Sequence, residues 1–274
     1  MLPYFKGYAI AVCAIAVALP LIASTVWPLV TGQIIASSLG GLALQFLLFF
    51  GGLMVGYRIF ERRAESVVDG YLEPYNDGCD PKALLDRGHK LACAITFPCN
   101  AQAAWFMGYY GQACLDEGRT EEARTIEEGL RQSISAQKKP DQKCAIIVSL
   151  VLLAEKLSSA SDALALIDEG LALISTSPSA EASAQRTYLE SQRAIMGARM
   201  AGDHEKLMDL DERVASSGAY PMRLRVEYAW DAAASAFKMG RVGEERRFLG
   251  FVAEHGGTLA LTEQARSRLA AMAA

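Results

Sequence analysis

The sequence has few of the residues from which catalytic and metal sites are built. Its three histidines, His89, His204 and His255, are widely separated, and none lies at metal-ligand spacing from another. The sequence contains neither a nucleophile with a paired base nor a glycine-rich phosphate loop. We therefore expect no enzyme activity, no cofactor and no resident metal. The alternative is an enzyme whose site forms between helices that are distant in the sequence.

Cysteine occurs, but never in a close pair. The six cysteines are at positions 13, 79, 93, 99, 114 and 144. Without a CxxC pair they indicate neither a zinc site nor a disulfide framework. Reduced, mostly buried thiols in a cytoplasmic domain are the expected state. The alternative is a metal bound by Cys79, Cys93, Cys99 and Cys114.

Charge is absent from the whole segment between Lys6 and Arg58, which is strongly apolar. One bilayer crossing needs about 20 apolar residues in a helix, so this segment is long enough for two. The sequence predicts a transmembrane hairpin over residues 1–63, with spans at about 8–30 and 34–60. Gly32 and its polar neighbours would form the turn between the spans.

Basic residues at the ends of the spans predict how the hairpin is oriented. Lys6 precedes the first span, and Arg58, Arg62 and Arg63 lie at the end of the second. Because cytoplasmic flanks carry the excess of Lys and Arg, we expect a multi-pass membrane protein with both termini and the soluble domain in the cytoplasm. A cleaved signal peptide over about residues 1–24 is an alternative for the first span. It would leave the soluble domain in the cytoplasm.

Small and polar residues in the second span indicate close helix packing. Gly52 and Gly56 have the four-residue spacing that lets membrane helices approach closely. Gln45, near mid-membrane, would seek a hydrogen-bond partner on another helix. The contacts are either with the first span of the same chain or with a second copy in a homo-oligomer. Spans without ionisable residues argue against a pore or a transporter.

The rest of the chain has the composition of an acidic, helical protein. From residue 64 onward it has 23 basic and 30 acidic residues, a formal charge of about −7. That balance argues against a nucleic-acid partner. Ala, Leu, Glu and Arg dominate, and no alternation of strand type persists. The sequence predicts a linker over residues 64–80 and an all-α domain over 81–274.

Breaks in the helical pattern recur along this domain. Turns at Gly118, Ser158, Gly202 and Gly240 are separated by 40, 44 and 38 residues, a loose period typical of stacked helix pairs. Asp80-Pro81 marks the first helix start. The helices are expected at about 81–95, 102–117, 121–134, 144–157, 161–174, 181–200, 205–216, 223–239, 244–254 and 261–272.

Two segments share a pattern of small and apolar residues. The first contains Tyr110-Gly111, Gly118, Glu122-Ala123 and Leu130, and the second contains Asp162-Ala163, Ile167 and Gly170-Leu171. Both resemble the second halves of tetratricopeptide repeats, in which a small residue lets the paired helices touch. The later pairs depart from the pattern, with Leu207 and Glu245 at the small position. Residues 75–81 also resemble the entry segment of bacterial membrane-anchored helical-repeat proteins. The resemblance implies an α-solenoid following the transmembrane hairpin, and no activity.

Such a solenoid exposes a concave face that commonly holds an extended peptide or another protein. Aromatic, arginine and glutamine residues on the first helices of the pairs are candidates for that face. They are Trp105, Tyr109, Gln112, Arg193, Arg223, Tyr228 and Trp230. Packing in the core between paired helices is the alternative for Trp105, Tyr109 and Trp230, and also for Tyr228, Arg193 and Arg223.

The sequence thus favours a membrane-anchored adaptor that binds a protein or peptide partner in its solenoid groove. The lipid bilayer is its other partner. A structural accessory subunit of a larger membrane complex, assembled through the second transmembrane helix, is the alternative. The adaptor predicts that Tyr228 and Arg193 are exposed. The subunit predicts that replacing Gly52 and Gly56 by Leu abolishes assembly.

Overall fold

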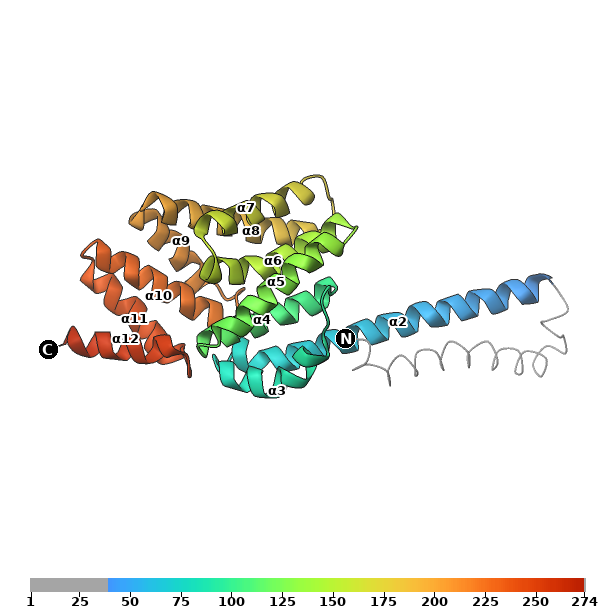
Figure 1. The fold of residues 1–274 in the computed structure, drawn as a ribbon, viewed down its shortest axis with the longest axis horizontal. Coiled ribbons are helices and arrows are strands. Elements are labelled where there is room, and N and C mark those ends of the chain that lie inside the picture. Colours follow the sequence, from blue (N-terminus) through green and yellow to red (C-terminus); the bar gives the residue numbers. More distant parts are fainter. Residues whose placement is uncertain (1–38, 274) are drawn as a thin grey trace. The chain divides into compact units, whose positions relative to one another are not determined.

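The computed structural model describes residues 39–273, and every regular element in that range is an α-helix (Figure 1). The predicted all-α class is therefore confirmed for this part of the chain. The helices are α2 (Leu39–Asn76), α3 (Pro81–Ala94), α4 (Ala101–Asp116), α5 (Thr120–Ala136), α6 (Pro140–Leu157), α7 (Ala160–Leu173), α8 (Ala180–Ala201), α9 (His204–Ser216), α10 (Met222–Lys238), α11 (Val242–His255) and α12 (Ala260–Ala271). The chain divides into two compact units, Met1–Gly70 and Tyr71–Ala274.

In the first unit, the structure describes one helix, which is the part of α2 from residue 39 to residue 70. The predicted first span and the turn after it lie outside the described residues. Large hydrophobic side chains on α2 are exposed: Phe46, Leu47, Phe50, Met54 and Val55. Among the residues that the structure describes, we find no helix with the length and apolar character needed to cross a membrane.

Helix α2 continues through most of the residues predicted to form a linker over 64–80. The helix ends at Asn76, and the chain then turns through Gly78 into α3. The physical reason is an apolar repeat at helical spacing, since Val68, Leu72 and Tyr75 are all buried. The boundary of the second unit, at Tyr71, therefore falls inside a helix.

Local signals set the helix boundaries of the second unit. Asp80 accepts a hydrogen bond from the Ala83 amide at 3.0 Å, and Pro81 is the first residue of α3. Asn100 caps α4 in the same way. Helix α7 begins at Ala160, and Ser159 caps it by accepting a hydrogen bond from the Asp162 amide at 3.1 Å. Side-chain oxygens thus satisfy amides that the first helical turn leaves free.

The four predicted turns all separate consecutive helices. Three of them contain a glycine with positive φ: 73° at Gly118, 67° at Gly202 and 70° at Gly240. A left-handed backbone at the end of a helix favours glycine because a Cβ atom would meet the following carbonyl. Ser158 ends α6 without a positive φ.

Helices of the second unit pack chiefly on helices that are one or two places away in the chain. Helix α6, for example, packs against α4, α5, α7 and α8. Glycines permit close approach, since a Cβ atom at Gly111 would lie 2.9 Å from Leu153 and one at Gly170 would lie 2.8 Å from Leu189. These two glycines are in the segments that resemble tetratricopeptide repeats.

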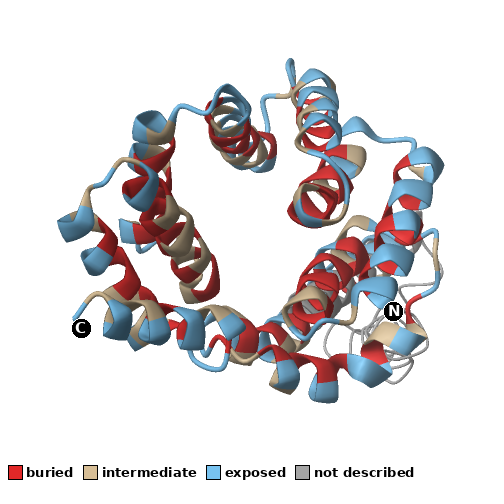
Figure 2. Cartoon of the chain, turned by 60° about the vertical axis from the view of Figure 1, so that its left-hand side comes forward, coloured by how far each residue is buried: buried red, intermediate tan, exposed pale blue. Residues whose placement is uncertain are grey.

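The helices of the second unit follow one another around a ring (Figure 2). The two ends of the array, α2–α3 and α11–α12, meet. The Thr258 amide donates to the Cys79 carbonyl at 3.2 Å, and the Thr258 hydroxyl donates to the same oxygen at 3.3 Å. Residues 179 positions apart in the sequence are therefore in direct contact.

Candidate functional site

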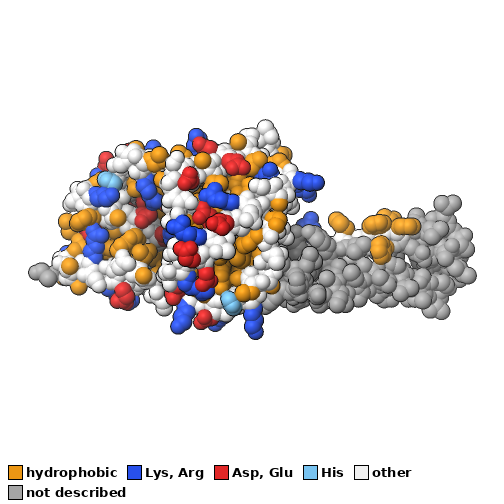
Figure 3. All heavy atoms as spheres, in the orientation of Figure 1, with side chains coloured by type: hydrophobic (Ala, Val, Ile, Leu, Met, Phe, Trp, Pro, Cys, Tyr) orange, Lys and Arg blue, Asp and Glu red, His pale blue; other side chains and the backbone are white. Residues whose placement is uncertain are grey.

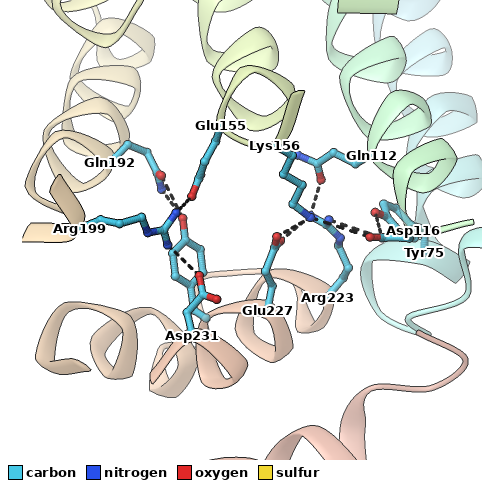
Figure 4. A network of polar contacts seen from close by, with 11 residues as sticks. Tyr75, Gln112, Asp116, Glu155, Lys156, Gln192, Arg199, Arg223, Glu227 and Asp231 are labelled. Atoms are coloured by element: carbon cyan, nitrogen blue, oxygen red, sulfur yellow. Dashed lines mark hydrogen bonds and ion pairs between the residues drawn. The ribbon is translucent and has the colours of Figure 1, made fainter. Parts of the chain in front are cut away.

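One face of α10 has polar side chains that contact four other helices. Arg223, Glu227 and Asp231 recur every fourth residue, and Tyr228 lies beside them, so all four share a face. Their partners come from α2, α4, α6 and α8 (Figure 4). We call this set the α10 network. The partners are Tyr75, Gln112, Asp116, Glu155, Lys156, Gln192 and Arg199.

Arg223 is the most buried charge in the α10 network, with 1% of its surface exposed. Its guanidinium donates to the Gln112 side-chain oxygen and lies 3.5 Å from Asp116 and 3.1 Å from Glu227. It also sits over the Tyr75 ring, 5.0 Å from the centroid. The Tyr75 hydroxyl donates to Asp116 at 2.6 Å. Arg223 thus joins α10 to α4 and to the end of α2.

Two further bridges connect α10 with α6 and α8. Lys156 lies 2.5 Å from Glu227 and 3.9 Å from Asp116. Arg199 pairs with Glu155 and lies 2.8 Å from Asp231.

The side chains of Tyr228 and Gln192 are also hydrogen-bonded. The Tyr228 hydroxyl lies 2.7 Å from Gln192 Nε2 and 3.0 Å from Gln192 Oε1. Each bridge joins α10 to a helix that precedes α9 in the chain.

The α10 network shifts pKa values in both directions. Burial opposes the charge on Arg223, but Glu227, Tyr75 and Asp116 outweigh that effect and raise its pKa. Burial likewise opposes ionisation of Glu227, yet Arg223 and Lys156 lower its pKa to about 2. These two groups are therefore charged at neutral pH, and each charge stabilises the other.

Carboxylates around Arg199 have raised pKa values. Burial raises the pKa of Asp231 to about 6, although Arg199 lowers it. Asp211 on α9 is fully buried, and its two carboxylate oxygens have no hydrogen-bond partner among the described residues. Burial and the nearby Asp231 raise the pKa of Asp211 to about 8, against an opposing effect of Arg199. Asp211 is therefore mainly protonated at neutral pH.

The α10 network is suited to holding helices together. Three cations and four carboxylates satisfy one another, and the remaining polar groups are hydrogen-bonded. In the described part of the chain, no group of three or more His, Cys, Asp or Glu side chains is placed to hold a metal ion. Cys79, Cys99 and Cys114 are buried free thiols, whereas Cys93 is exposed.

Four of the predicted partner-binding residues are buried in or beside the α10 network: Tyr109, Gln112, Arg223 and Tyr228. The expectation that Tyr228 is exposed is wrong, because only 8% of its surface is accessible and its hydroxyl is bonded to Gln192. The expectation for Arg193 is confirmed. Its side chain is 59% exposed and lies 3.0 Å from Asp168.

The two tryptophans differ from each other. Trp105 is 39% exposed and packs edge-on against the Tyr109 ring, with centroids 4.9 Å apart. Trp230 is half-buried. Of the residues predicted to pack the second span, Gly52 is buried. The surroundings of Gln45 and Gly56 are outside what the structure describes.

Most charges of the α10 network could not be recognised from the sequence pattern. Arg223, Glu227 and Asp231 occur at i, i+4 and i+8, a signal that was present in the sequence. Lys156, Glu155 and Arg199 gave no comparable signal. They lie near the carboxyl ends of their helices, where charged residues are usually solvated.

We compared the chain with protein-family models, with curated proteins and with solved structures, and none of the three comparisons found a match.

Proposed function

We propose that the protein is a membrane-anchored adaptor whose second unit is a tetratricopeptide-like α-solenoid that binds another protein or peptide. The observation that carries the proposal is the exposed apolar face of α2. Phe46, Phe50 and Met54 recur every fourth residue and are more than half exposed, and exposed hydrophobic side chains are visible in Figure 3. A contiguous apolar face marks a membrane or protein contact.

The anchor in this proposal is a hairpin with spans at about residues 8–30 and 34–60. The segment lacks charge, and Arg58, Arg62 and Arg63 stand at its carboxyl end. The proposed arrangement is multi-pass in the cell membrane, with both termini and the second unit in the cytoplasm. Attachment raises the effective concentration of a bound partner near the bilayer.

The packing of the second unit supports the solenoid part of the proposal. Consecutive helices pack on one another, short turns connect them, and Gly111 and Gly170 bring helices into close contact. Helix-pair arrays with these features commonly bind proteins. Basic and acidic side chains are interspersed on the surface shown in Figure 3, and the chain is acidic overall. Both features favour a protein partner over a nucleic acid.

Trp105 on α4 and Arg193 on α8 are the predicted binding residues that are exposed. Tryptophan and arginine dominate binding energy at protein interfaces. We propose that they contact the partner first. The four buried candidates become available only if the α10 network opens.

The test is a crosslinking pulldown of the full chain from its native membranes, comparing wild type with a Trp105→Ala, Arg193→Ala double variant. A discrete protein captured by wild type should be lost from the double variant. Arg124→Ala is the matched control, since Arg124 is an exposed helical arginine with a weak ion pair at 4.0 Å. If wild type, the double variant and Arg124→Ala all capture the same set of proteins, Trp105 and Arg193 do not form the binding surface.

A second candidate function is a structural accessory subunit assembled through the second transmembrane helix, including as a homo-oligomer. The exposed apolar side chains of α2 favour it, because Phe46 and Phe50 leave a face that a helix of another chain can cover. Gly52 is buried within the chain itself, so the test uses this exposed face. A Phe46→Ala, Phe50→Ala variant should abolish a high-mass complex on native gels, with Phe237→Ala as the control. Retention of the complex in the double variant would exclude this assembly route.

A further inference from the structure

The ring of the second unit is closed by few contacts. Helices elsewhere in the ring are held by packing against neighbours in the chain, and α10 packs chiefly against α9, α11 and α12. Three groups of polar contacts hold α10–α12 against the helices from α2 to α6. Arg223 contacts Gln112, Asp116 and Tyr75. Lys156 on α6 lies 2.5 Å from Glu227 on α10, and Thr258 contacts Cys79. We call these three groups the clasp.

The clasp differs energetically from the rest of the array. Burial of apolar surface between consecutive helices is a cooperative and non-directional source of stability. A buried ion pair, by contrast, gains little net free energy, because desolvation offsets most of the attraction. The hydrogen bonds at Thr258 contribute modestly for the same reason. The ends of the ring can therefore separate at a smaller cost than any helix can unfold.

We propose that the clasp opens and closes the ring while the helices on both sides stay folded. Opening releases Arg223 from Asp116 and Gln112, separates Glu227 from Lys156, and uncovers the inner faces of α4 and α10. Helices α3–α6 and α9–α12 keep their mutual packing in the open form. The uncovered residues include those assigned above to a partner. The use of these residues to bind a partner rests on the proposed function, whereas the opening of the ring does not.

Cys79 provides a probe for opening that is already in the chain. Its side chain is fully buried, and its carbonyl accepts both hydrogen bonds from Thr258. Cys114 on α4 and Cys144 on α6 are also fully buried, but they lie in packed helices away from the Thr258 contact. Opening should expose Cys79 alone, whereas unfolding should expose all three thiols.

The experiment is alkylation of the full chain by iodoacetamide, with the rate at each cysteine followed by mass spectrometry. We compare wild type with Arg223→Met, which keeps the length of the side chain and removes its charge. Cys79 should react about tenfold faster in this variant, the effect expected for loss of a buried charged hydrogen bond. Cys114 and Cys144 should keep their wild-type rates. Arg193→Met, at an exposed ion pair, is the matched control and should change none of the rates.

The charge of Arg223 also affects the acidity of Cys79. This effect opposes the expected increase in alkylation rate, which makes the test stricter. Burial raises the pKa of Cys79 to about 11, and the charge of Arg223 partly lowers it. Removing that charge raises the pKa further and reduces the reactive thiolate. Faster alkylation of Cys79 in Arg223→Met therefore cannot result from altered acidity, and must reflect access.

An unchanged Cys79 rate in Arg223→Met would overturn the proposal. If all three buried thiols react faster, the variant has lost its fold, and Thr258→Val decides. Thr258 is exposed, and valine removes the hydroxyl bond to the Cys79 carbonyl without changing any charge near the thiol. Selective acceleration at Cys79 in Thr258→Val supports the clasp, and any other pattern excludes it. None of these outcomes depends on a partner, so failure of the adaptor proposal is recognised separately in the pulldown.

Discussion

Asp211 shows how a single residue limits the stability of this fold. Its carboxyl group is buried without a hydrogen-bond partner among the described residues, and its pKa is raised from 3.8 to about 8. The folded state therefore binds a proton that the unfolded state releases. The contribution of Asp211 to the free energy of unfolding is greatest below about pH 4 and falls as the pH rises to about 8.

Asp211→Asn should remove this pH-dependent loss. Asparagine keeps the shape of the side chain but cannot ionise, so the variant should be more stable than wild type at pH 8 by about 1–3 kcal/mol. Thermal unfolding followed by circular dichroism between pH 5 and 8.5 measures the difference. Asp209→Asn, on the same helix but exposed, should leave the wild-type slope unchanged. Equal slopes for Asp211→Asn and wild type would contradict the assignment.

At the scale of the element, helix ends and helix interiors require different residues. Gly202 ends α8 with φ of 67°, and Gly197 lies within the same helix. In neither case does a neighbouring atom lie within 4 Å of an added Cβ. Backbone conformation alone therefore separates the two positions.

Gly202→Ala should destabilise the protein by about 1–2 kcal/mol, because an L side chain is strained at positive φ. Gly197→Ala should stabilise it by about 0.5–1 kcal/mol, because alanine loses less conformational freedom in a helix than glycine. Urea unfolding of both variants gives the two values, and each variant serves as the control for the other. Changes of the same sign would show that packing dominates over backbone conformation here.

Elements were more predictable than their assembly. The ten helices expected after residue 80 are all present, with small shifts at their ends, because capping side chains, prolines and glycines act within a few residues. The linker over 64–80 was the exception. Gly70, Pro74 and Gly78 suggest a break, but the buried stripe that includes Leu72 keeps most of this segment helical.

At the scale of the whole molecule, the proposed anchor is open to a direct test. A Phe50→Asp, Met54→Asp variant places two charges on the exposed apolar face of α2. Charges cost several kcal/mol in hydrocarbon, so a larger fraction of this variant than of wild type should pass from the membrane pellet to the supernatant after carbonate extraction, with the first proposed span left intact.

Phe237→Asp serves as the control for the anchor test, since Phe237 is 60% exposed on α10. This variant should stay with the membrane fraction, as wild type should. Equal partition of the α2 variant and the control would contradict the anchoring role of α2.

The sequence alone determined the features that depend on neighbouring residues: the apolar segment at the amino end, the helices, the turns and the acidic balance. It also singled out Arg223, Gln112 and Tyr228 as groove residues, and left core packing open for Arg223 and Tyr228. Tertiary structure decided their role. Arg223 meets Gln112 across 111 positions, and Thr258 meets Cys79 across 179. The direction in which the array curves determines such contacts. That curvature results from many small packing angles, which no local pattern in the sequence specifies.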